Sequence, residues 1–117
     1  MGLSTHVLDT MHGTPAGGMR VTLSSTRDGH AQDIKRFTLN DDGRNPDGPL
    51  FTDEALQTGT YRLSFEVAAY FRARGVALPE PPFLDVVHLD FGVAAANEHY
   101  HVPLLVSPWS YATYRGS

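Results

Sequence analysis

Histidines are the side chains of this 117-residue chain that most clearly could do chemistry, and there are six of them. Two of them, His99 and His101, are separated by a single tyrosine. Because residues two apart in a β-strand share a face, both imidazoles would lie opposite Tyr100, Val102 and Leu104. The apolar trio is the natural core face, so we expect the imidazoles to reach solvent or a neighbouring subunit. A histidine in that setting can act as a general base or proton shuttle near neutral pH.

Two histidines on one strand face could also bind a metal ion. A zinc site needs three or four protein ligands, and no cluster of carboxylates and histidines completes such a set by spacing alone. Three other histidines have plainer interpretations. We expect His12 and His30 to be solvated residues of turns, and His88 to be a surface or cross-strand residue.

Arg44 and the C-terminal residues are further candidates. Arg44 follows two aspartates and a glycine in a turn, where an arginine could simply be a loop cation. Residues 111–117 are aromatic and polar up to the last position, and an ordered terminus is normally fixed by pairing in a sheet or at an interface. Ser117 alone is a weak candidate nucleophile, because no Gly-x-Ser-x-Gly elbow surrounds it. The chain has no cysteine, which excludes thiol nucleophiles, disulfides and cysteine-type zinc sites.

The elements that must position these residues are short β-strands. Apolar and polar residues alternate with a period of two between frequent Gly and Pro breaks, which is typical of half-buried strands. The segments with this pattern are residues 3–8, 19–23, 37–39, 61–67, 83–91, 100–106 and 111–114. Residues 67–75 instead suit a helix of two turns that stops at Gly75. The whole predicts an all-β fold, an antiparallel β-sandwich. The longest irregular segment, residues 40–49, contains Arg44, and such loops are often functional.

Size and charge limit the functions. A chain of 117 residues is expected to form one domain, residues 1–117, around a single core. Nine basic residues are scattered among thirteen acidic ones, for a net charge of −4, which argues against a nucleic-acid partner. No segment approaches the ~20 apolar residues that cross a bilayer, and the first residues lack a basic, apolar leader. We therefore expect a cytoplasmic protein with no membrane partner.

The two ends of the sequence resemble a known family. Residues 99–108, His-Tyr-His-Val-Pro-Leu-Leu-Val-Ser-Pro, and the terminus Tyr-Arg-Gly-Ser at 114–117 closely resemble the end of 5-hydroxyisourate hydrolases of the transthyretin-like family. Residues 3–10 resemble the first block of that family, and residues 42–44, 59–61 and 70–71 resemble its middle blocks. The resemblance covers essentially the whole chain, and the Tyr-Arg-Gly-Ser end is its most specific part.

This resemblance implies a fold, an assembly and a reaction. The fold would be a transthyretin-like sandwich of two four-stranded sheets with one short helix. The chain would form a homotetramer with active sites at the dimer–dimer interface. The reaction would be hydrolysis of 5-hydroxyisourate to 2-oxo-4-hydroxy-4-carboxy-5-ureidoimidazoline in urate (purine) breakdown, without a metal or organic cofactor. By motif, the resemblance implies that the catalytic residues would be His6, Arg44, His101 and Ser117, and that His6, Arg44 and Tyr114 would bind the substrate.

The chemistry of ring opening suits these residue types. We expect His101 or His6 to take the proton from the attacking water, and Arg44 to stabilise the developing oxyanion. Tyr114 would orient the ring. Direct attack by water is preferred to a covalent intermediate, because the chain has no cysteine and no serine elbow.

Two other functions share the fold. A transthyretin-like protein that binds a small hormone without catalysis should lack both the His and Arg set and the Tyr-Arg-Gly-Ser end. A β-sandwich interaction module would leave the six histidines unexplained. Both alternatives are therefore weaker than the hydrolase.

Overall fold

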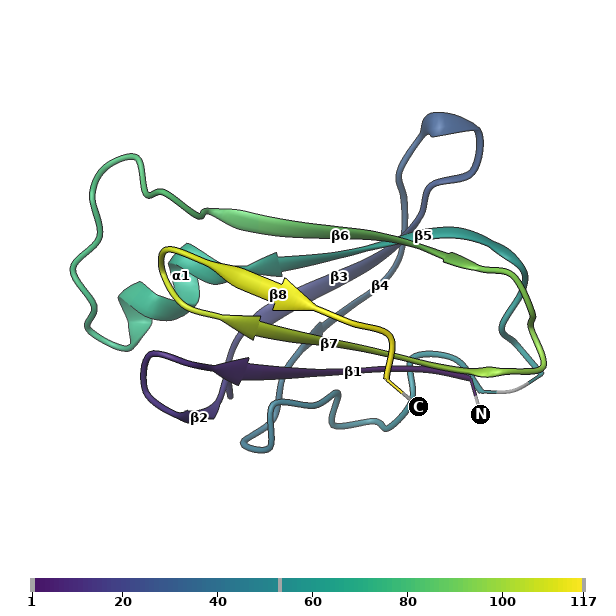
Figure 1. Ribbon diagram of the computed structural model, residues 1–117, viewed down its shortest axis with the longest axis horizontal. Helices are drawn as coiled ribbons and strands as arrows, with labels where there is room; N and C mark the ends of the chain where they lie inside the picture. The colour runs from purple at the N-terminus through teal and green to yellow at the C-terminus, as the bar shows by residue number, and fades with distance from the viewer. Residues whose placement is uncertain (1, 53, 117) are drawn as a thin grey trace.

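Two four-stranded β-sheets pack face to face, with a short helix at one end (Figure 1). The computed structural model describes residues 2–52 and 54–116. The first sheet has the order β2-β1-β7-β8 and consists of β1 (Gly2–Asp9), β2 (Thr14–Pro15), β7 (His99–Val106) and β8 (Tyr111–Thr113). The second has the order β4-β3-β5-β6 and consists of β3 (Arg20–Ser25), β4 (Gln32–Thr38), β5 (Gly59–Glu66) and β6 (Val86–Val93). This architecture confirms the predicted sandwich of two four-stranded sheets.

One strand pair departs from the antiparallel rule. β1 and β7 run parallel, with Gly2 beside His99 at one end and Asp9 beside Val106 at the other. All other strand pairs given for the two sheets are antiparallel. Parallel neighbours need a long connection instead of a tight turn, and here almost the whole chain lies between the two strands.

The core fills the space between the sheets. Alternation along β1 buries Leu3 and Val7 completely and leaves Ser4, His6 and Leu8 half-buried on the outer face. The largest fully buried side chains come from both sheets, the helix and the residue before β3: Phe65, Phe71, Leu3, Met19, Leu23, Leu63 and Leu104. Burying each such side chain stabilises the fold by about 1.5–3 kcal/mol before entropy is counted. The inner faces of the sheets therefore form the core, and polar side chains on the outer faces can contact solvent or a ligand.

The ends of the helix and of β6 can be compared with the ends predicted from the sequence. Helix α1 (Val67–Ala73) follows β5 directly, and Gly75 after it has a φ of 82°, the left-handed conformation that ends many helices. The predicted helix is thus confirmed. The predicted strand over residues 83–91 begins too early, because Glu66 at the end of β5 pairs with Val86. Phe83 has no strand partner there and is 69% exposed.

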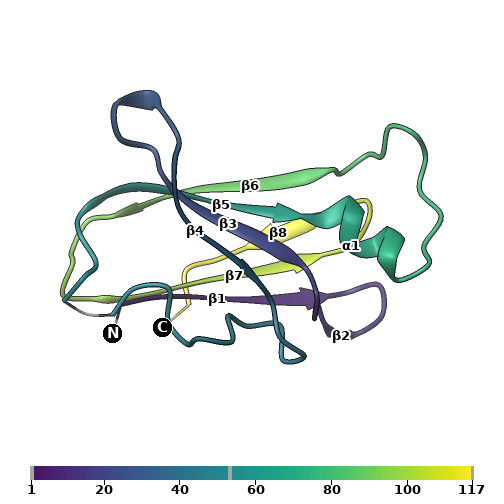
Figure 2. The same ribbon diagram turned by 180° about the vertical axis from the view of Figure 1, so that it is seen from behind.

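Residues 40–51 close the free edge of β1 (Figure 2). The amide of Leu3 donates to the carbonyl of Phe51 (3.1 Å), and the amide of Val7 donates to the carbonyl of Gly43 (3.0 Å). The predicted irregular loop is therefore fixed against the strand that carries His6. No helix among the described residues is long and apolar enough to span a membrane.

Candidate functional site

Three predicted site residues meet on the outer face of the first sheet. In the parallel β1–β7 pair, Ser4 lies beside His101 and Gly2 beside His99. Ser4, His6, His99 and His101 are all half-buried on that face. Arg44 forms an isolated antiparallel bridge with His6 and is exposed. The structure therefore brings His6, His101 and Arg44 together from three separate segments.

A turn before Arg44 determines its place. The side-chain oxygen of Asn40 accepts hydrogen bonds from the amides of Asp42 (2.9 Å) and Arg44 (3.1 Å). Gly43 has a φ of 74°, and a Cβ added to it would lie 2.5 Å from the carbonyl oxygen of Val7. Only glycine permits both that backbone conformation and that approach to β1. The Asp-Gly-Arg sequence thus sets the arginine directly opposite His6.

The C-terminal residues pair with β7, as expected for an ordered end. The amide of Gly116 donates to the carbonyl of His101 at 2.7 Å. Arg115 donates to the carboxylate of Glu98 (2.8 Å) and to the carbonyl of His99 (3.2 Å), and its guanidinium stacks 4.1 Å above the ring of Tyr100. These contacts hold the tail beside the histidine pair.

One predicted residue of the tail, Tyr114, is not brought to this group. Tyr114 is 60% exposed and lines a groove of about 370 Å³ together with Phe91, Tyr100 and Val102. Neither His6, His101 nor Arg44 lines that groove. Ser117 lies outside the described residues. The roles predicted for Tyr114 and Ser117 therefore stay predictions.

The surroundings of His101 favour its neutral form. Burial lowers the pKa of His101, and electrostatic repulsion from Arg44 and from the neighbouring imidazoles of His6 and His99 lowers it further. Its ring lies nearly parallel to that of His99, with centroids 6.4 Å apart. The Nδ1 atom of His101 is 2.8 Å from the hydroxyl of Ser4. A neutral imidazole can accept a proton, so His101 suits a general base near pH 7.

The same face combines a proton acceptor with a permanently charged cation. Arg44 supplies planar N–H donors that match the oxygens of a carbonyl or an oxyanion. Across residues 2–52 and 54–116, no three His, Cys, Asp or Glu side chains are grouped so as to hold a metal ion. A neutral imidazole and a guanidinium on one face are groups that can accept a proton from water and stabilise an oxyanion.

His12 is an exposed turn residue, as expected, and also makes a contact that the sequence did not predict. Its Nδ1 lies 2.6 Å from the carboxylate of Asp9, which is fully buried. Its ring also stacks on Phe71 with centroids 6.2 Å apart. The sequence did contain a signal for this contact. In the spacing Asp-x-x-His at the end of a strand, the aspartate carboxylate can accept hydrogen bonds from the histidine three residues later in the turn. His30 is also exposed, as expected. His88 pairs across strands with Ser64, which was expected too.

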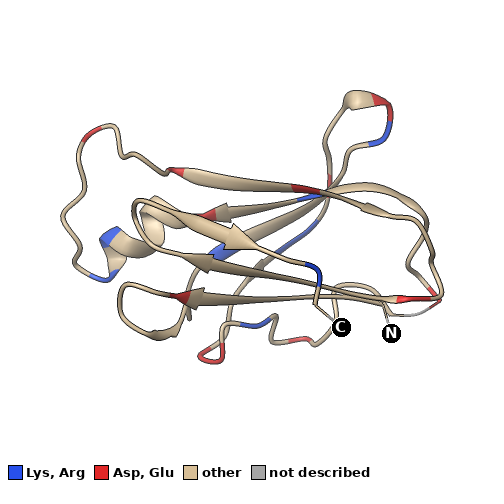
Figure 3. Cartoon of the chain, in the orientation of Figure 1, with Lys and Arg blue, Asp and Glu red and all other residues tan. Residues whose placement is uncertain are grey.

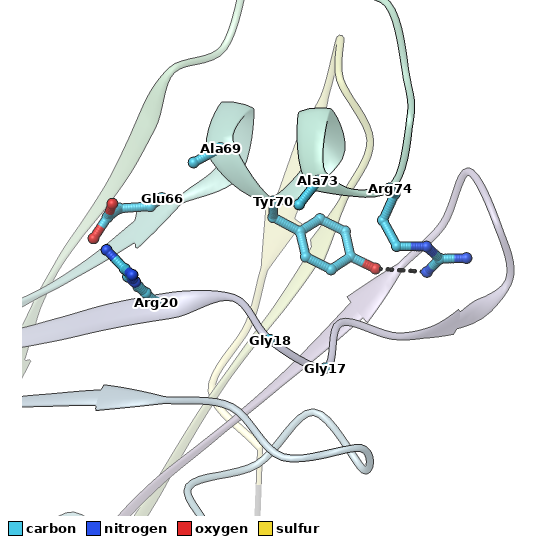
Figure 4. A pocket seen from close by; sticks show the side chains of 8 residues that line it. All are labelled: Gly17, Gly18, Arg20, Glu66, Ala69, Tyr70, Ala73 and Arg74. Carbon is cyan, nitrogen blue, oxygen red and sulfur yellow. Dashed lines mark hydrogen bonds between the residues drawn. The ribbon is translucent and has the colours of Figure 1, made fainter.

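A groove of about 490 Å³ lies beside α1 (Figure 4). It is lined by Gly17, Gly18, Arg20, Glu66, Ala69, Tyr70, Ala73 and Arg74, and so includes none of the predicted site residues. Acidic and basic residues are interspersed over both sheets and the loops (Figure 3). The outer face of β1 and β7 is therefore where the predicted chemistry converges.

Comparison with known proteins gives consistent matches over almost the full length. Residues 3–116 match the model of the HIUase/Transthyretin family. A 5-hydroxyisourate hydrolase of Ralstonia nicotianae is 58% identical over 115 residues, which cover 98% of this chain and 97% of the relative. The solved structure of Klebsiella pneumoniae 5-hydroxyisourate hydrolase is 33% identical, with a TM-score of 0.79, and the match covers 98% of this chain and 92% of that one. Sea bream transthyretin in complex with thyroxine is 30% identical, with a TM-score of 0.84, over 99% of this chain and 95% of that one.

Proposed function

We propose, from the premise that the chain belongs to the HIUase/Transthyretin family, that it is an enzyme that hydrolyses 5-hydroxyisourate. The fold alone does not decide the function, since the thyroxine-binding sea bream protein shares it. The relative at 58% identity is a hydrolase, which favours the enzyme over the hormone-binding alternative. The observation that carries the proposal is the convergence of His6, Arg44 and His101 on one face.

The proposed reaction starts with water. His101, neutral near pH 7, takes a proton from a water molecule as its oxygen adds to a carbonyl carbon of the six-membered ring. Arg44 stabilises the negative charge that develops on the carbonyl oxygen. The carbon–nitrogen bond of the ring then breaks, and the proton passes to the leaving nitrogen. The product is one molecule, 2-oxo-4-hydroxy-4-carboxy-5-ureidoimidazoline, which carries a ureido group and a carboxyl group, and the carboxyl group releases the second proton of the water to solvent.

The remaining predicted residues complete the proposed site. His6 lies opposite Arg44 and would bind the flat, polar ring with it. Tyr114 would orient the ring, and Ser117 would contribute to catalysis from the end of the tail. No metal or organic cofactor is needed for this chemistry.

The proposal extends to assembly and location. Residues 1–117 would form one catalytic domain, and four copies would form a homotetramer with active sites at the dimer–dimer interfaces. The enzyme would act in the cytoplasm in urate breakdown, with the small molecule as its substrate. Size-exclusion chromatography with light scattering would test the tetramer directly.

An ultraviolet assay tests the reaction. Freshly made 5-hydroxyisourate should lose its near-ultraviolet absorbance much faster with the protein than in buffer, and His101→Asn should slow this by at least about tenfold. His88→Asn is the matched control, because it changes the same residue type on the outer face of the other sheet. A hormone carrier would give no turnover. No acceleration at micromolar protein would reject the proposed enzymatic activity. Full activity in His101→Asn would reject His101 as the general base.

A further inference from the structure

A serine on β1 lies against the imidazole of His101 on β7. The Ser4 hydroxyl oxygen and the Nδ1 atom of His101 are 2.8 Å apart, although 97 positions separate them in sequence. The parallel register places these two residues directly beside each other on the outer face. Both are half-buried, so the bond is partly shielded from water. The contact therefore belongs to the sheet itself and does not depend on a mobile loop.

The opposite edge of the same ring is held by the tail. A Cβ built on Gly116 would lie 2.8 Å from Cδ2 of His101, closer than side-chain carbons normally approach. The backbone of Gly116 is fixed there by its 2.7 Å bond to the carbonyl of His101. The ring is thus confined at Nδ1 by Ser4 and at Cδ2 by Gly116. Neither Ser4 nor Gly116 confines the edge that carries Cε1 and Nε2, so this edge can face a reacting water molecule.

In a neutral imidazole one ring nitrogen carries a proton and the other carries a lone pair. The hydrogen bonds of the ring decide which nitrogen is protonated. If Nδ1–H donates to the Ser4 oxygen, the lone pair is on Nε2. If the Ser4 hydroxyl donates instead, Nε2 carries the proton and cannot act as a base. A base at Nε2 therefore requires the first arrangement.

We propose that Ser4 is a positioning residue that accepts a hydrogen bond from Nδ1–H of His101 and so presents the Nε2 lone pair to the attacking water. This inference rests on the proposed hydrolase function for its catalytic consequence, but the tautomer it assigns can be observed without turnover. Ser4 contacts the base and not the substrate, so its removal should lower kcat more than it raises KM.

The chain contains a matched pair that separates a catalytic effect from a structural one. The hydroxyl of Ser64 also lies 2.8 Å from the Nδ1 of a histidine, His88, across two strands of the second sheet. That pair is exposed and lies away from Arg44 and His101. Loss of either serine hydroxyl removes the same kind of cross-strand hydrogen bond, but only one of them is at the proposed base.

The kinetic test compares three variants with the wild type. We expect Ser4→Ala to lower kcat by about tenfold to a hundredfold, the range found when groups that orient a functional histidine are removed. KM should change by less than about threefold. Ser4→Thr keeps the hydroxyl and should restore most of kcat, and Ser64→Ala should match the wild type. Equal kcat in Ser4→Ala and wild type, with both folded, would overturn the proposal.

Nuclear magnetic resonance supplies the second readout. Long-range ¹H–¹⁵N spectra of the histidine side chains, with His101 assigned from the His101→Asn spectrum, report which nitrogen is protonated. The wild type and Ser4→Thr should show Nδ1–H at His101, and Ser4→Ala should shift the population towards Nε2–H. Nε2–H in the wild type, or no change in Ser4→Ala, would overturn the assignment. Because this spectrum needs no substrate, absence of hydrolysis by the wild type would reject the proposed function and leave the tautomer test intact.

Discussion

His101 is the residue whose protonation should set the pH dependence of the reaction. Burial lowers its pKa from the ordinary 6.5, and electrostatic repulsion from Arg44 and from the imidazoles of His6 and His99 acts in the same direction. A lowered pKa means that the imidazole stays neutral to a lower pH than a free histidine does. The proposed base is therefore present over a wider acidic range than its type alone would suggest.

The pH profile gives a prediction at this scale. The acid limb of kcat/KM should fall at a pH below 6.5 in the wild type. Arg44→Ala should lower the rate by about tenfold or more and should also move the acid limb upwards, because one cation no longer opposes protonation of His101. Rates measured from about pH 5 to pH 8 would show both effects. An acid limb with its midpoint at or above pH 6.5 in the wild type would contradict a lowered pKa of His101. An acid limb at the same pH in Arg44→Ala and the wild type would contradict the effect of Arg44 on that pKa.

Sequence predicts part of this residue-scale picture. The His-Tyr-His alternation predicts correctly that His99 and His101 leave the core face, because the period of a strand is local. Ser4 could not be found in that way, since its partner lies 97 positions away and only the register of β1 and β7 joins them. The burial of Asp9 was missed for a similar reason, because its partner Tyr70 comes from the helix.

At the scale of elements, the loop of residues 40–51 acts as an extra edge of the first sheet. Its hydrogen bonds to Leu3 and Val7 place Arg44 beside a strand, not on a free loop. Gly43 makes the closest approach, against the carbonyl of Val7. The position of the arginine should therefore depend on the absence of a side chain at residue 43.

Two glycines of this loop allow a controlled test. Gly43→Ala and Gly48→Ala both place alanine at a positive φ, which costs about 1–2 kcal/mol, but a Cβ at Gly48 meets nothing within 4 Å. Gly43→Ala should therefore lower kcat/KM by about tenfold or more, while Gly48→Ala lowers only the melting temperature. Activity assays and thermal unfolding of both variants would check this. Equal activity in the two variants would show that the approach to β1 does not position Arg44.

The order of neighbours was harder to predict than the elements themselves. Alternation in the sequence predicts most strands and the helix α1, because those patterns are local. It does not predict that β1 pairs in parallel with β7, or that a proline-rich loop closes the edge of β1. Both features depend on contacts between distant segments, and both are needed to assemble the site.

At the scale of the whole molecule, a buried carboxylate links the first sheet to the helix. Asp9 at the end of β1 is fully buried and accepts hydrogen bonds from the hydroxyl of Tyr70 (2.8 Å) and the amide of His12 (3.0 Å). Tyr70 in turn accepts from Arg74 at 2.9 Å, at the rim of the groove in Figure 4. Burial raises the pKa of Asp9, but the bonds from His12 and Tyr70 outweigh it, and the pKa is lowered overall.

This network should govern acid stability. Because the folded-state pKa of Asp9 lies below its ordinary 3.8, the carboxylate stabilises the fold above that pH, and the contribution is lost as the pH falls through the lower value. Asp9→Asn should destabilise the fold by about 3 kcal/mol at pH 7 and flatten the loss of stability in acid. Urea unfolding from pH 7 down to about pH 3 would measure both.

Asp33→Asn is the control for this prediction. Asp33 also has a lowered pKa, but its bond to Arg36 is on the exposed edge of the second sheet. Exposed ion pairs contribute little to stability, so this variant should unfold close to the wild type. Similar destabilisation by both substitutions would mean that burial of Asp9 is not the cause.

β1 and β7 stand side by side although one lies near the beginning of the chain and the other near its end. Closing a loop of that length costs more chain entropy than closing a hairpin, and such long-range contacts slow folding. A partly folded chain could bring Arg44 to His6, but it would still lack His101 and the tail. Synthesis on the ribosome proceeds from β1 to β7, so His101 can join His6 and Arg44 only after residues 99–106 have been made. The proposed site is thus assembled in the same step that pairs β7 with β1.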